Sequence, residues 1–377
     1  MSNPSTASRP LQGVKIVESS SYLTGPLASV MLLDLGAEVI KVEPPGGDGF
    51  RSFGHGQQGW SALWTSSNRG KRSIVLDLKA EDDLATMKQL IAEADVLMEN
   101  WRPRVASSLG LGQDVVCAIN PRLVRLSVTG FGSTGPLSAA PAFDSLIQGR
   151  TGMVDLLADS GAPEVAPYWI VDKVVATFAA QAILAALYQR ERTGAGSHVS
   201  LPMLDVMTYF NFPDMFQHRT FVDDTTVRRP TPSPVVRTSD GHIVVTPVSG
   251  AQISRTLKAL ERPDIKEELL SIGDAVAVAE TFYRRIGEIL PTRTTEHWLA
   301  LFESFDLPVA PVTKLEDHLS DPQVIHNKLY HTIDTPAGAL RAVRYPATFD
   351  GAQLVPQGPA PRPGEHAAEI RSALGAR

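Results

Sequence analysis

The sequence contains almost no cysteine, because Cys117 is the single thiol among 377 residues. One thiol cannot form an intramolecular disulfide, and it cannot build a metal site from several thiolates. Cys117 lies in the segment DVVCAINP, a predicted helix with no histidine nearby, so we expect a small buried side chain and no nucleophile. The low cysteine content fits a reducing compartment, and we expect the protein in the cytoplasm.

Positive charge is not in excess either, since 35 Lys and Arg residues face 41 Asp and Glu residues. Proteins that bind nucleic acids are normally basic, so the net charge of -6 argues against a nucleic-acid partner. The cations are concentrated in one region, several of them near predicted strand ends: Arg51, Arg69, Lys71, Arg72, Lys79, Lys88 and Arg102. This concentration favours a small polyanionic ligand, although a solvated surface also explains Lys88 and Arg69.

Long hydrophobic runs are missing as well. The longest weakly polar run, residues 174–187, is shorter than the roughly 20 residues that span a bilayer, so we expect a core helix and no membrane partner. Residues 1–10 are polar and rich in Ser and Pro, without the pattern of a signal or transit peptide. We expect these ten residues to form a disordered lead.

Several motifs of well-known sites are absent. Glu43 ends a predicted strand where a ribose-binding acid would lie, but the preceding SSSYLTGPLASV offers one Gly followed by Pro instead of G-x-G-x-x-G. The chain has no G-x-x-x-x-G-K-[ST], no H-E-x-x-H and no G-x-S-x-G, and none of its nine histidines forms an i, i+4 pair. Metal sites, phosphoryl transfer and serine hydrolysis therefore all lose support, and the dinucleotide signal is weak.

Short apolar runs alternate with helical stretches through the first two hundred residues. We predict strands at 14–18, 39–43, 73–78, 95–100 and 123–130, and helices from Pro26 to Gly36 and at 81–94. This alternation is typical of an α/β fold with a mostly parallel sheet covered on both faces.

A second unit is expected further along the chain. A helix at about 203–218 leads into a stretch rich in Pro and Thr that is typical of a linker. Beyond it we predict a turn and strand at 239–249 and helices at about 251–259, 279–289 and 295–305, whereas the chain after Asp321 is rich in loops.

An acid begins the most apolar predicted helix of the chain. In YWIVDKVVATFAAQAILAALYQRERTG, Asp172 follows four bulky apolar residues, and the helix should end at Gly194. The helix is apolar almost all round, so we expect it to be buried. From this helix alone, Asp172 is either an N-cap or a reactive group shielded from water, and the N-cap is the commoner case.

Seven segments match one family in order and spacing, from about Leu11 to Gly375. They are GPLASVMLLDLGAEVIKVEPPGGDGFR, NRGKRSIVLDLK, ADVLMENWRP, LGLGQDVVCAINPRLV, SVTGFGSTGP, LPVAPVTKLEDHLSDPQV and GEHAAEI. The chain thereby resembles the family III CoA-transferases, which include formyl-CoA and carnitine CoA-transferases and the related α-methylacyl-CoA racemases. The resemblance implies a Rossmann-like large domain at 11–220 completed by a return segment at 326–377, a linker at 221–235 and a smaller α/β domain at 236–325. It also implies that two chains interlock as rings in a homodimer.

The resemblance also implies a chemistry. Asp172 matches the catalytic aspartate, which attacks an acyl-CoA thioester and then carries CoA as an aspartyl-CoA thioester to a free carboxylic acid. Asp144 matches an acid near this nucleophile, and it could orient groups, influence ionisation or cap a helix. Coenzyme A is then substrate, and no metal or redox cofactor is implied.

The same matches imply the CoA site. They place Leu76, Asp77, Leu78 and Lys79 after one strand and Asn100, Trp101 and Arg102 after another, with Phe143 beside Asp144. Relatives often carry an Arg at the positions of Pro44 and Ser108, so we expect Arg104, where Gly is usual, to compensate. In GFGSTGP, Gly130, Gly132 and Gly135 could turn their backbone toward the thioester, and an ordinary turn explains them equally well.

Two alternatives remain open. A racemase of this fold has a His immediately before the acid that Asp144 matches, whereas this chain has Phe143 there and no His between Gly130 and Asp172. The other alternative is a CoA-binding protein without activity. The donor and acceptor acids depend on the loops around FGHGQQGW and PVSGAQIS, where the family varies.

Overall fold

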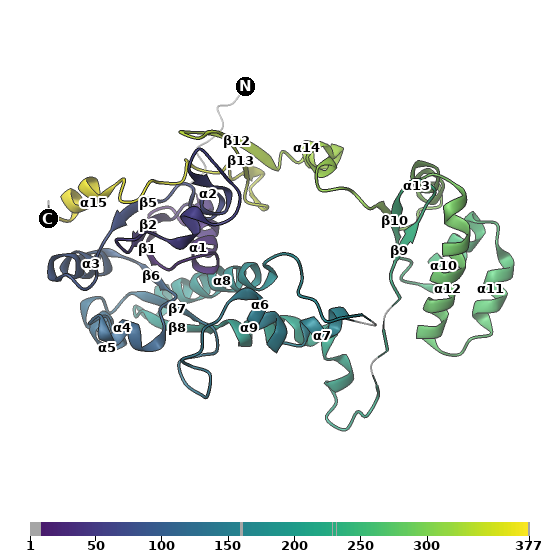
Figure 1. Ribbon diagram of the computed structural model, residues 1–377, viewed down its shortest axis with the longest axis horizontal. Helices are drawn as coiled ribbons and strands as arrows, with labels where there is room; N and C mark the ends of the chain where they lie inside the picture. The colour runs from purple at the N-terminus through teal and green to yellow at the C-terminus, as the bar shows by residue number, and fades with distance from the viewer. Residues whose placement is uncertain (1–8, 159–160, 228, 231, 376–377) are drawn as a thin grey trace. The chain divides into compact units, whose positions relative to one another are not determined.

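The computed structural model of the chain describes residues 9–158, 161–227, 229–230 and 232–375. Its contacts divide the chain into two units (Figure 1), the first ending at Gln217 and resuming at Lys328, the second comprising His218–Asn327. Residues 1–8 of the predicted disordered lead lie outside the described residues. Arg9, near the end of that lead, donates hydrogen bonds to the carbonyl oxygens of Asp34 and Val355.

The first unit is built on a sheet of six parallel strands. The strands follow one another from top to bottom in Figure 1 in the order β5 (Arg72–Val75), β2 (Glu38–Glu43), β1 (Lys15–Ser19), β6 (Val96–Glu99), β7 (Val124–Thr129) and β8 (Ser197–Pro202). The parallel sheet and its first five strands confirm the sequence prediction. The sequence missed β8, an edge strand in which no residue is fully buried.

Helices cover both faces of this sheet, as predicted. Ile16 of β1 packs toward α1 (Thr24–Asp34) and α8 (Ile170–Thr193), whereas its neighbour Val17 packs toward the opposite face. That face carries α3 (Glu81–Glu93), α5 (Gln113–Ile119) and α15 (Ala367–Gly375) (Figure 1). Successive residues of a strand point to opposite faces, so the apolar residues of the strands supply both cores.

The helix α8 differs in part from its prediction. Its 24 residues are long and apolar enough to cross a membrane, but it packs against α1, β7 and β8 as a core helix. Only one face is buried, from Val171 to Leu187, while Tyr188 is exposed, because the described neighbours of α8 in this unit leave part of its surface uncovered. The predicted stop is confirmed, since Gly194 has a left-handed φ of 75° and its N–H bonds to the Arg190 carbonyl oxygen.

Cys117 lies in a helix as predicted, but the prediction that its side chain is buried was wrong. The helix α5 turns Val116 into the core and leaves Cys117 exposed, because a short amphipathic helix buries one residue per turn and Val116 holds that place.

The remaining elements of the first unit are short. They are η1 (Gly49–Ser52), β3 (Gly56–Gln57), β4 (Trp60–Ser61), α2 (Ala62–Asn68), α4 (Pro103–Ser108), α6 (Asp144–Arg150), α7 (Met153–Ala158), α9 (Met203–Met215), β12 (Tyr330–Thr335), β13 (Gly338–Val343), β14 (Thr348–Phe349) and β15 (Ala352–Gln353). The pair β12 and β13 forms an antiparallel hairpin in the part of the chain that we predicted to be rich in loops. The short helix η2 (Gln217–Arg219) stands where the two units meet in sequence.

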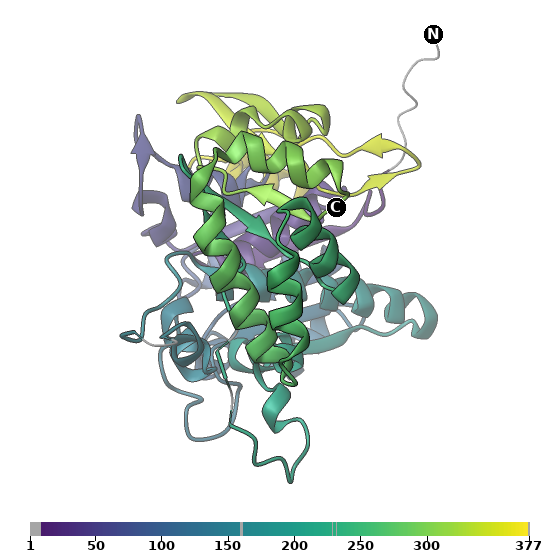
Figure 2. The same cartoon turned by 90° about the vertical axis from the view of Figure 1, so that its right-hand side faces the viewer.

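The second unit has its own core between a short antiparallel sheet and several helices (green in Figure 2). Its strands are β9 (Val235–Arg237), β10 (His242–Val245) and β11 (Val309–Pro311), with β10 in the middle. Its helices are α10 (Gly250–Ala259), α11 (Pro263–Leu270), α12 (Ala275–Ile289), η3 (Leu290–Thr292), α13 (Thr295–Ser304), η4 (Asp317–Ser320) and α14 (Pro322–His326). The smaller α/β unit was predicted, and α11 was missed.

Candidate active site

The carboxyl ends of β1 and β6 form the switch point of the sheet. The chain leaves β1 through α1 to β2 on one side, while β6 lies on its other side, and ligands of such sheets bind where the connections diverge. Asn100 joins the two strand ends, because its side chain accepts from the Ser21 N–H (3.1 Å) and donates to the Ser21 carbonyl oxygen (3.0 Å). Asn100, a predicted site residue, thus links the segments that follow β1 and β6.

Asp172 reaches the same edge from α8. Thr24 begins α1 directly beyond the end of β1, and its hydroxyl donates to Asp172 Oδ1 at 2.5 Å. The N-cap of α8 is Trp169, and Asp172 lies inside the first turn with its side chain directed to Thr24. The helix-cap explanation of Asp172 was therefore wrong.

The carboxyl group of Asp172 holds its proton more tightly than a solvated acid. Burial raises its pKa to about 6, the hydrogen bond from Thr24 opposes this rise, and the negative charge of Asp144 adds to it. At neutral pH the group is still mostly ionised. It is thus an anion that has lost much of its hydration, which is the condition for a nucleophilic carboxylate.

Asp144 holds the backbone on which Asp172 stands. Its Oδ2 accepts the Asp172 N–H (3.1 Å), and its Oδ1 accepts from Gln148 Nε2 (2.5 Å). Gln148 Oε1 in turn accepts the Ala166 N–H (2.9 Å), so the segment entering α8 is fixed at two points. The predicted nearness of the two acids is present in the structure, and a side chain from α6 takes up a free N–H of the α8 terminus.

Gly130 allows this arrangement. A Cβ atom at Gly130 would lie 2.1 Å from the Cβ of Ala142, so only glycine lets the end of β7 approach the segment before Asp144. Gly132 and Gly135 have φ angles of 95° and 88°, which favour glycine in turns. The turn explanation therefore accounts for Gly132 and Gly135.

Five aromatic rings, which we call the aromatic cluster, contact one another at the edge of the sheet where α6 and α8 begin: Tyr22, Phe50, Phe53, Phe143 and Trp169. Trp169 lies 6.2 Å from Phe50 and 6.0 Å from Phe53 between ring centroids. Tyr22 bridges Phe50 and Phe143 at 6.1 and 5.9 Å, edge to face. Phe143 and Trp169 immediately precede α6 and α8, so the cluster flanks the starts of both helices that carry the acids.

A buried ionic network supports the loops after β1 and β2, which carry Tyr22, Phe50 and Phe53. Lys41 Nζ lies 3.0 Å from both Glu18 Oε1 and Asp48 Oδ2, and Lys71 Nζ lies 2.9 Å from Glu18 Oε2. Burial opposes the charge of Glu18, but the two lysines lower its pKa to about 2. Burial lowers the pKa of Lys71 to about 8 against the attraction of Glu18.

The cationic concentration seen in the sequence is mostly neutralised by neighbouring carboxylates. Arg51 pairs with Glu43, Arg69 with Asp34, Lys71 with Glu18, and Arg72 with Glu38 and Glu369. Lys79, Arg102 and Arg104 are exposed, and among the described residues no ion pair joins them to a carboxylate. Of the predicted cations these three are therefore the most open to a ligand, while Lys88 lies half-buried on α3, and the wider patch was an overestimate.

The other residues predicted to bind CoA fall into two groups, one with side chains packed in the core and one at the ends of the strands. Leu76 is buried in the sheet core, and Leu78 and Trp101 pack against the same core, so their side chains are turned inward. Asp77 Oδ1 accepts the Lys79 N–H at 3.1 Å and shapes the turn after β5. Three strand spacings separate the ends of β5 and β6, about 14 Å, so the residues after β5 and those after β6 share one edge of the sheet without touching.

Sequence reasoning missed Thr24, Tyr22, Phe50 and Phe53. Their sole signal is position, because they lie directly after the first two predicted strands and the carboxyl ends of parallel strands meet at one edge.

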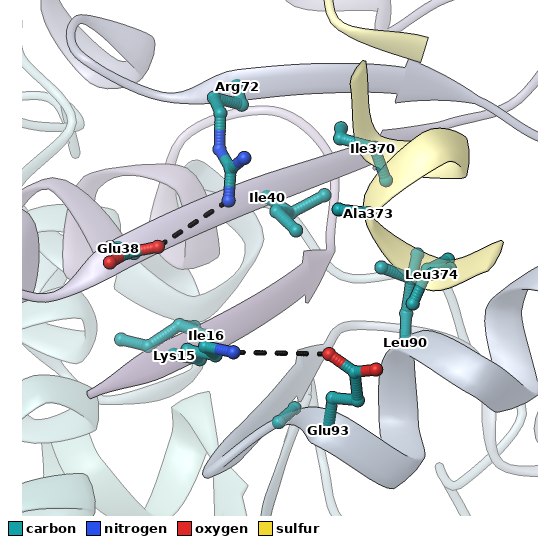
Figure 3. A pocket seen from close by; sticks show the side chains of 11 residues that line it. Lys15, Ile16, Glu38, Ile40, Arg72, Leu90, Glu93, Ile370, Ala373 and Leu374 are labelled. Atoms are coloured by element: carbon teal, nitrogen blue, oxygen red, sulfur yellow. Dashed lines mark hydrogen bonds and ion pairs between the residues drawn. The ribbon is translucent and has the colours of Figure 1, made fainter. Parts of the chain in front are cut away.

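A separate cavity opens at the opposite edge of the sheet. Figure 3 shows it between α15 and the amino ends of β1, β2 and β5, with ion pairs Lys15–Glu93 (3.9 Å) and Arg72–Glu38 (3.5 Å) over an apolar floor. None of the predicted site residues lines it. The charges that line this cavity are paired with one another and are not free for a charged ligand. We therefore place the candidate active site at the carboxyl edge, where the predicted site residues lie.

Comparison with known proteins gives consistent matches over nearly the whole chain. The sequence model described as CoA-transferase family III matches residues 11–367. A succinate–glutarate CoA-transferase from Agrobacterium fabrum is 31% identical over 97% of this chain and 96% of its own length. A cinnamoyl-CoA:phenyllactate CoA-transferase from Clostridium sporogenes is 30% identical over 96% of this chain and 93% of its own length.

Solved structures agree with these matches. The crystal structure of a CAIB/BAIF family protein from Brucella suis has a TM-score of 0.84 and 30% sequence identity, covering 97% of this chain and 100% of that one.

Proposed function

The chain belongs to the family III CoA-transferases, and we propose that it moves CoA from an acyl-CoA to a free carboxylic acid through a thioester on Asp172. The observation that carries this proposal is the partly buried carboxylate of Asp172, fixed by Thr24 and raised in pKa to about 6. Such a group is ionised at neutral pH but poorly hydrated, as a carboxylate nucleophile requires.

The proposed reaction has two steps that then run in reverse. A carboxylate oxygen of Asp172 attacks the thioester carbonyl carbon, the carbon–sulfur bond breaks, and a mixed anhydride and CoA thiolate form. The thiolate attacks the Asp172 carbonyl carbon, which releases the donor acid and leaves aspartyl-CoA. The acceptor carboxylate then forms a new anhydride on Asp172, and the returning thiolate gives the new acyl-CoA and the free aspartate.

The neighbouring groups support this role. Thr24 donates a hydrogen bond to Oδ1 of Asp172, and Oδ2 of Asp172 accepts none from the described residues. Oδ2 of Asp172 is therefore the oxygen placed to attack. Asp144 fixes the first turn of α8 and keeps the carboxylate in place during both attacks.

We propose that Lys79, Arg102 and Arg104 bind the phosphates of CoA. Each is exposed, each lies at or beyond the carboxyl end of β5 or β6, and none is paired with a carboxylate among the described residues. Arginine and lysine near strand ends are suited to phosphate oxygens. Asn100 at the switch point would lie beside the pantetheine arm between them.

A racemase is the less well supported alternative. It needs two groups on opposite faces of the α-carbon, and the position before Asp144 holds Phe143, whose ring cannot take a proton. Solvent deuterium entering 2-methylacyl-CoA without any CoA exchange would favour the racemase.

We also propose that the protein acts as a homodimer. On α9, Tyr209, Phe210 and Phe212 are 74%, 47% and 45% exposed, and Tyr209 packs edge to face on Phe178 of α8. Apolar surface of this kind is typical of a protein interface. Light scattering after size-exclusion chromatography should give twice the mass of one chain, and Tyr209→Glu should shift it toward the monomer.

The central experiment replaces the nucleophile. Asp172→Ala should reduce exchange of CoA between an acyl-CoA and a free acid on the order of 10³-fold or more, while CoA still binds. In the unaltered enzyme, acyl-CoA followed by hydroxylamine should label Asp172, as read by mass spectrometry of peptides.

The matched control is Asp114→Ala, an exposed acid in the first turn of α5. It should leave exchange unchanged. Near-normal exchange in Asp172→Ala, or labelling at another acid, would contradict the mechanism.

A further inference from the structure

The aromatic cluster lies where the acyl group of the substrate must come. Trp169 is three residues before the proposed nucleophile and Phe143 is one residue before Asp144. The other three rings come from the loops after β1 and β2, at the same edge of the sheet. A molecule whose carbonyl carbon meets Asp172 therefore has its remaining atoms close to these rings.

Most of the cluster is not covered by the first unit. Tyr22, Phe53, Phe143 and Trp169 are 45%, 48%, 55% and 38% exposed, while Phe50 beneath them is buried. Aromatic side chains bury large areas when they find a partner, and neighbouring rings prefer edge-to-face or offset contacts. A further flat apolar group is the ligand that would complete such a surface.

The charges near the aromatic cluster also favour an apolar ligand. Arg51 and Lys41 behind the rings are neutralised by Glu43, Glu18 and Asp48. Two exposed cations close in sequence to Trp169 and Phe143 lie over rings outside the cluster, Lys173 over Tyr168 at 4.8 Å and Arg150 over Phe131 at 5.6 Å. Among the described residues no cation lies over a ring of the cluster itself.

The cluster is also held in a fixed shape. Tyr22 has a φ of 67°, which is uncommon for a residue other than glycine, and its N–H donates to Asp48 Oδ1 at 3.2 Å. The same oxygen accepts the Phe50 N–H at 3.0 Å. The buried carboxylate of Asp48 therefore fixes the backbone conformation of Tyr22 and Phe50 before any substrate binds.

Building on the proposed function, we infer that the aromatic cluster is the acyl-binding surface and selects monocarboxylic acids with an apolar or aryl end. Short dicarboxylic acids are disfavoured, because their second carboxylate would lose its hydration against the rings without gaining a cation. A hydrophobic surface discriminates by about 10-fold or more for each group of methylene size or larger.

The test uses three acids with the same two-carbon spacer: 3-phenylpropanoate, butanoate and succinate, with acetyl-CoA as donor. We expect kcat/KM to fall in that order, with at least about 10-fold between the first and the last. Phe53→Ala and Trp169→Ala should each lower kcat/KM for 3-phenylpropanoate about 10-fold and change butanoate less. Phe53→Lys should raise the relative rate with succinate.

Tyr188→Ala is the control, since Tyr188 is an exposed ring on the same helix, α8, outside the cluster. It should leave all three acids unchanged. Succinate used as well as 3-phenylpropanoate, or an equal loss for every acid in both ring variants, would overturn the inference and leave CoA transfer intact. No exchange with any acid would instead contradict the proposed function, and the inference with it.

Discussion

At the scale of single residues, the hydrogen bond from Thr24 limits how far burial raises the pKa of the proposed nucleophile, Asp172. Burial and Asp144 both raise the pKa of Asp172, and Thr24 is the side chain that lowers it. The balance leaves a group that is an anion at neutral pH and a neutral acid a little below it. Activity should therefore decline as the pH falls through about 6.

Replacing Thr24 by Val should move this decline to higher pH. Without the hydroxyl, the ionised form of Asp172 loses a hydrogen bond to a charged group, and the midpoint of the acidic limb should rise by about one pH unit. The measurement is kcat against pH. Thr24→Ser keeps the hydroxyl and should keep the midpoint, whereas an unmoved midpoint in Thr24→Val would show that Thr24 has only a packing role.

The residues of the site were only partly predictable from the sequence. Asp172 and Asp144 could be named from motifs, but their contact through the Asp172 N–H depends on how α6 meets α8. Thr24 is an ordinary helix residue until the packing of α1 on α8 brings its hydroxyl to the acid. Lys71 and Arg72 looked like ligand-binding cations because the sequence does not show that Glu18, Glu38 and Glu369 reach them.

At the scale of elements, the ends of β5 and β6 supply the proposed phosphate contacts. Buried apolar runs made five of the six strands predictable, although the strands also bury polar residues such as Glu18 and Arg125. The edge strand β8 has no fully buried position, and half of the positions of the β12 and β13 hairpin are exposed, so neither has a strong apolar pattern. The order of the strands in the sheet decides which loops become neighbours, and no local pattern encodes that order.

Removing the two cations at these ends tests the CoA site. Lys79→Ala and Arg102→Ala should each weaken CoA binding by about 1–3 kcal/mol, because each removes a charge-assisted hydrogen bond to phosphate. Isothermal calorimetry with CoA gives the affinity. Lys258→Ala, an exposed lysine on α10, is the control, and unchanged affinity in both site variants would place the phosphates elsewhere.

At the scale of the whole molecule, the first unit is assembled from two distant parts of the chain. Ser73 of β5 donates its N–H to His366 Nδ1, and the His366 N–H donates to the Ser73 carbonyl oxygen. Ile370 of α15 is 2% exposed and packs in the core of the β5 face. The second unit, inserted between these parts, has a separate core.

A charge in this returning helix should destabilise the first unit alone. Ile370→Asp places a carboxylate in an apolar core and should lower the free energy of unfolding of that unit by about 3 kcal/mol or more. Scanning calorimetry should show one transition at lower temperature and the transition of the second unit unmoved. Ser372→Asp adds the same charge at an exposed position of α15 and should change neither, while an equal shift of both transitions would contradict separate cores.

The return of α15 to β5 has a consequence for how the protein is made in a cell. Asp172 and every ring of the aromatic cluster are synthesised well before α15, so the strand that leads to Lys79 lacks its covering helix until residues 367–375 emerge from the ribosome. The second unit is contiguous in sequence and has its own core, so it can fold before the first unit has its last helix. A chain that stops early would carry the complete set of reactive side chains on an unfinished sheet, exposed to chaperones and proteases.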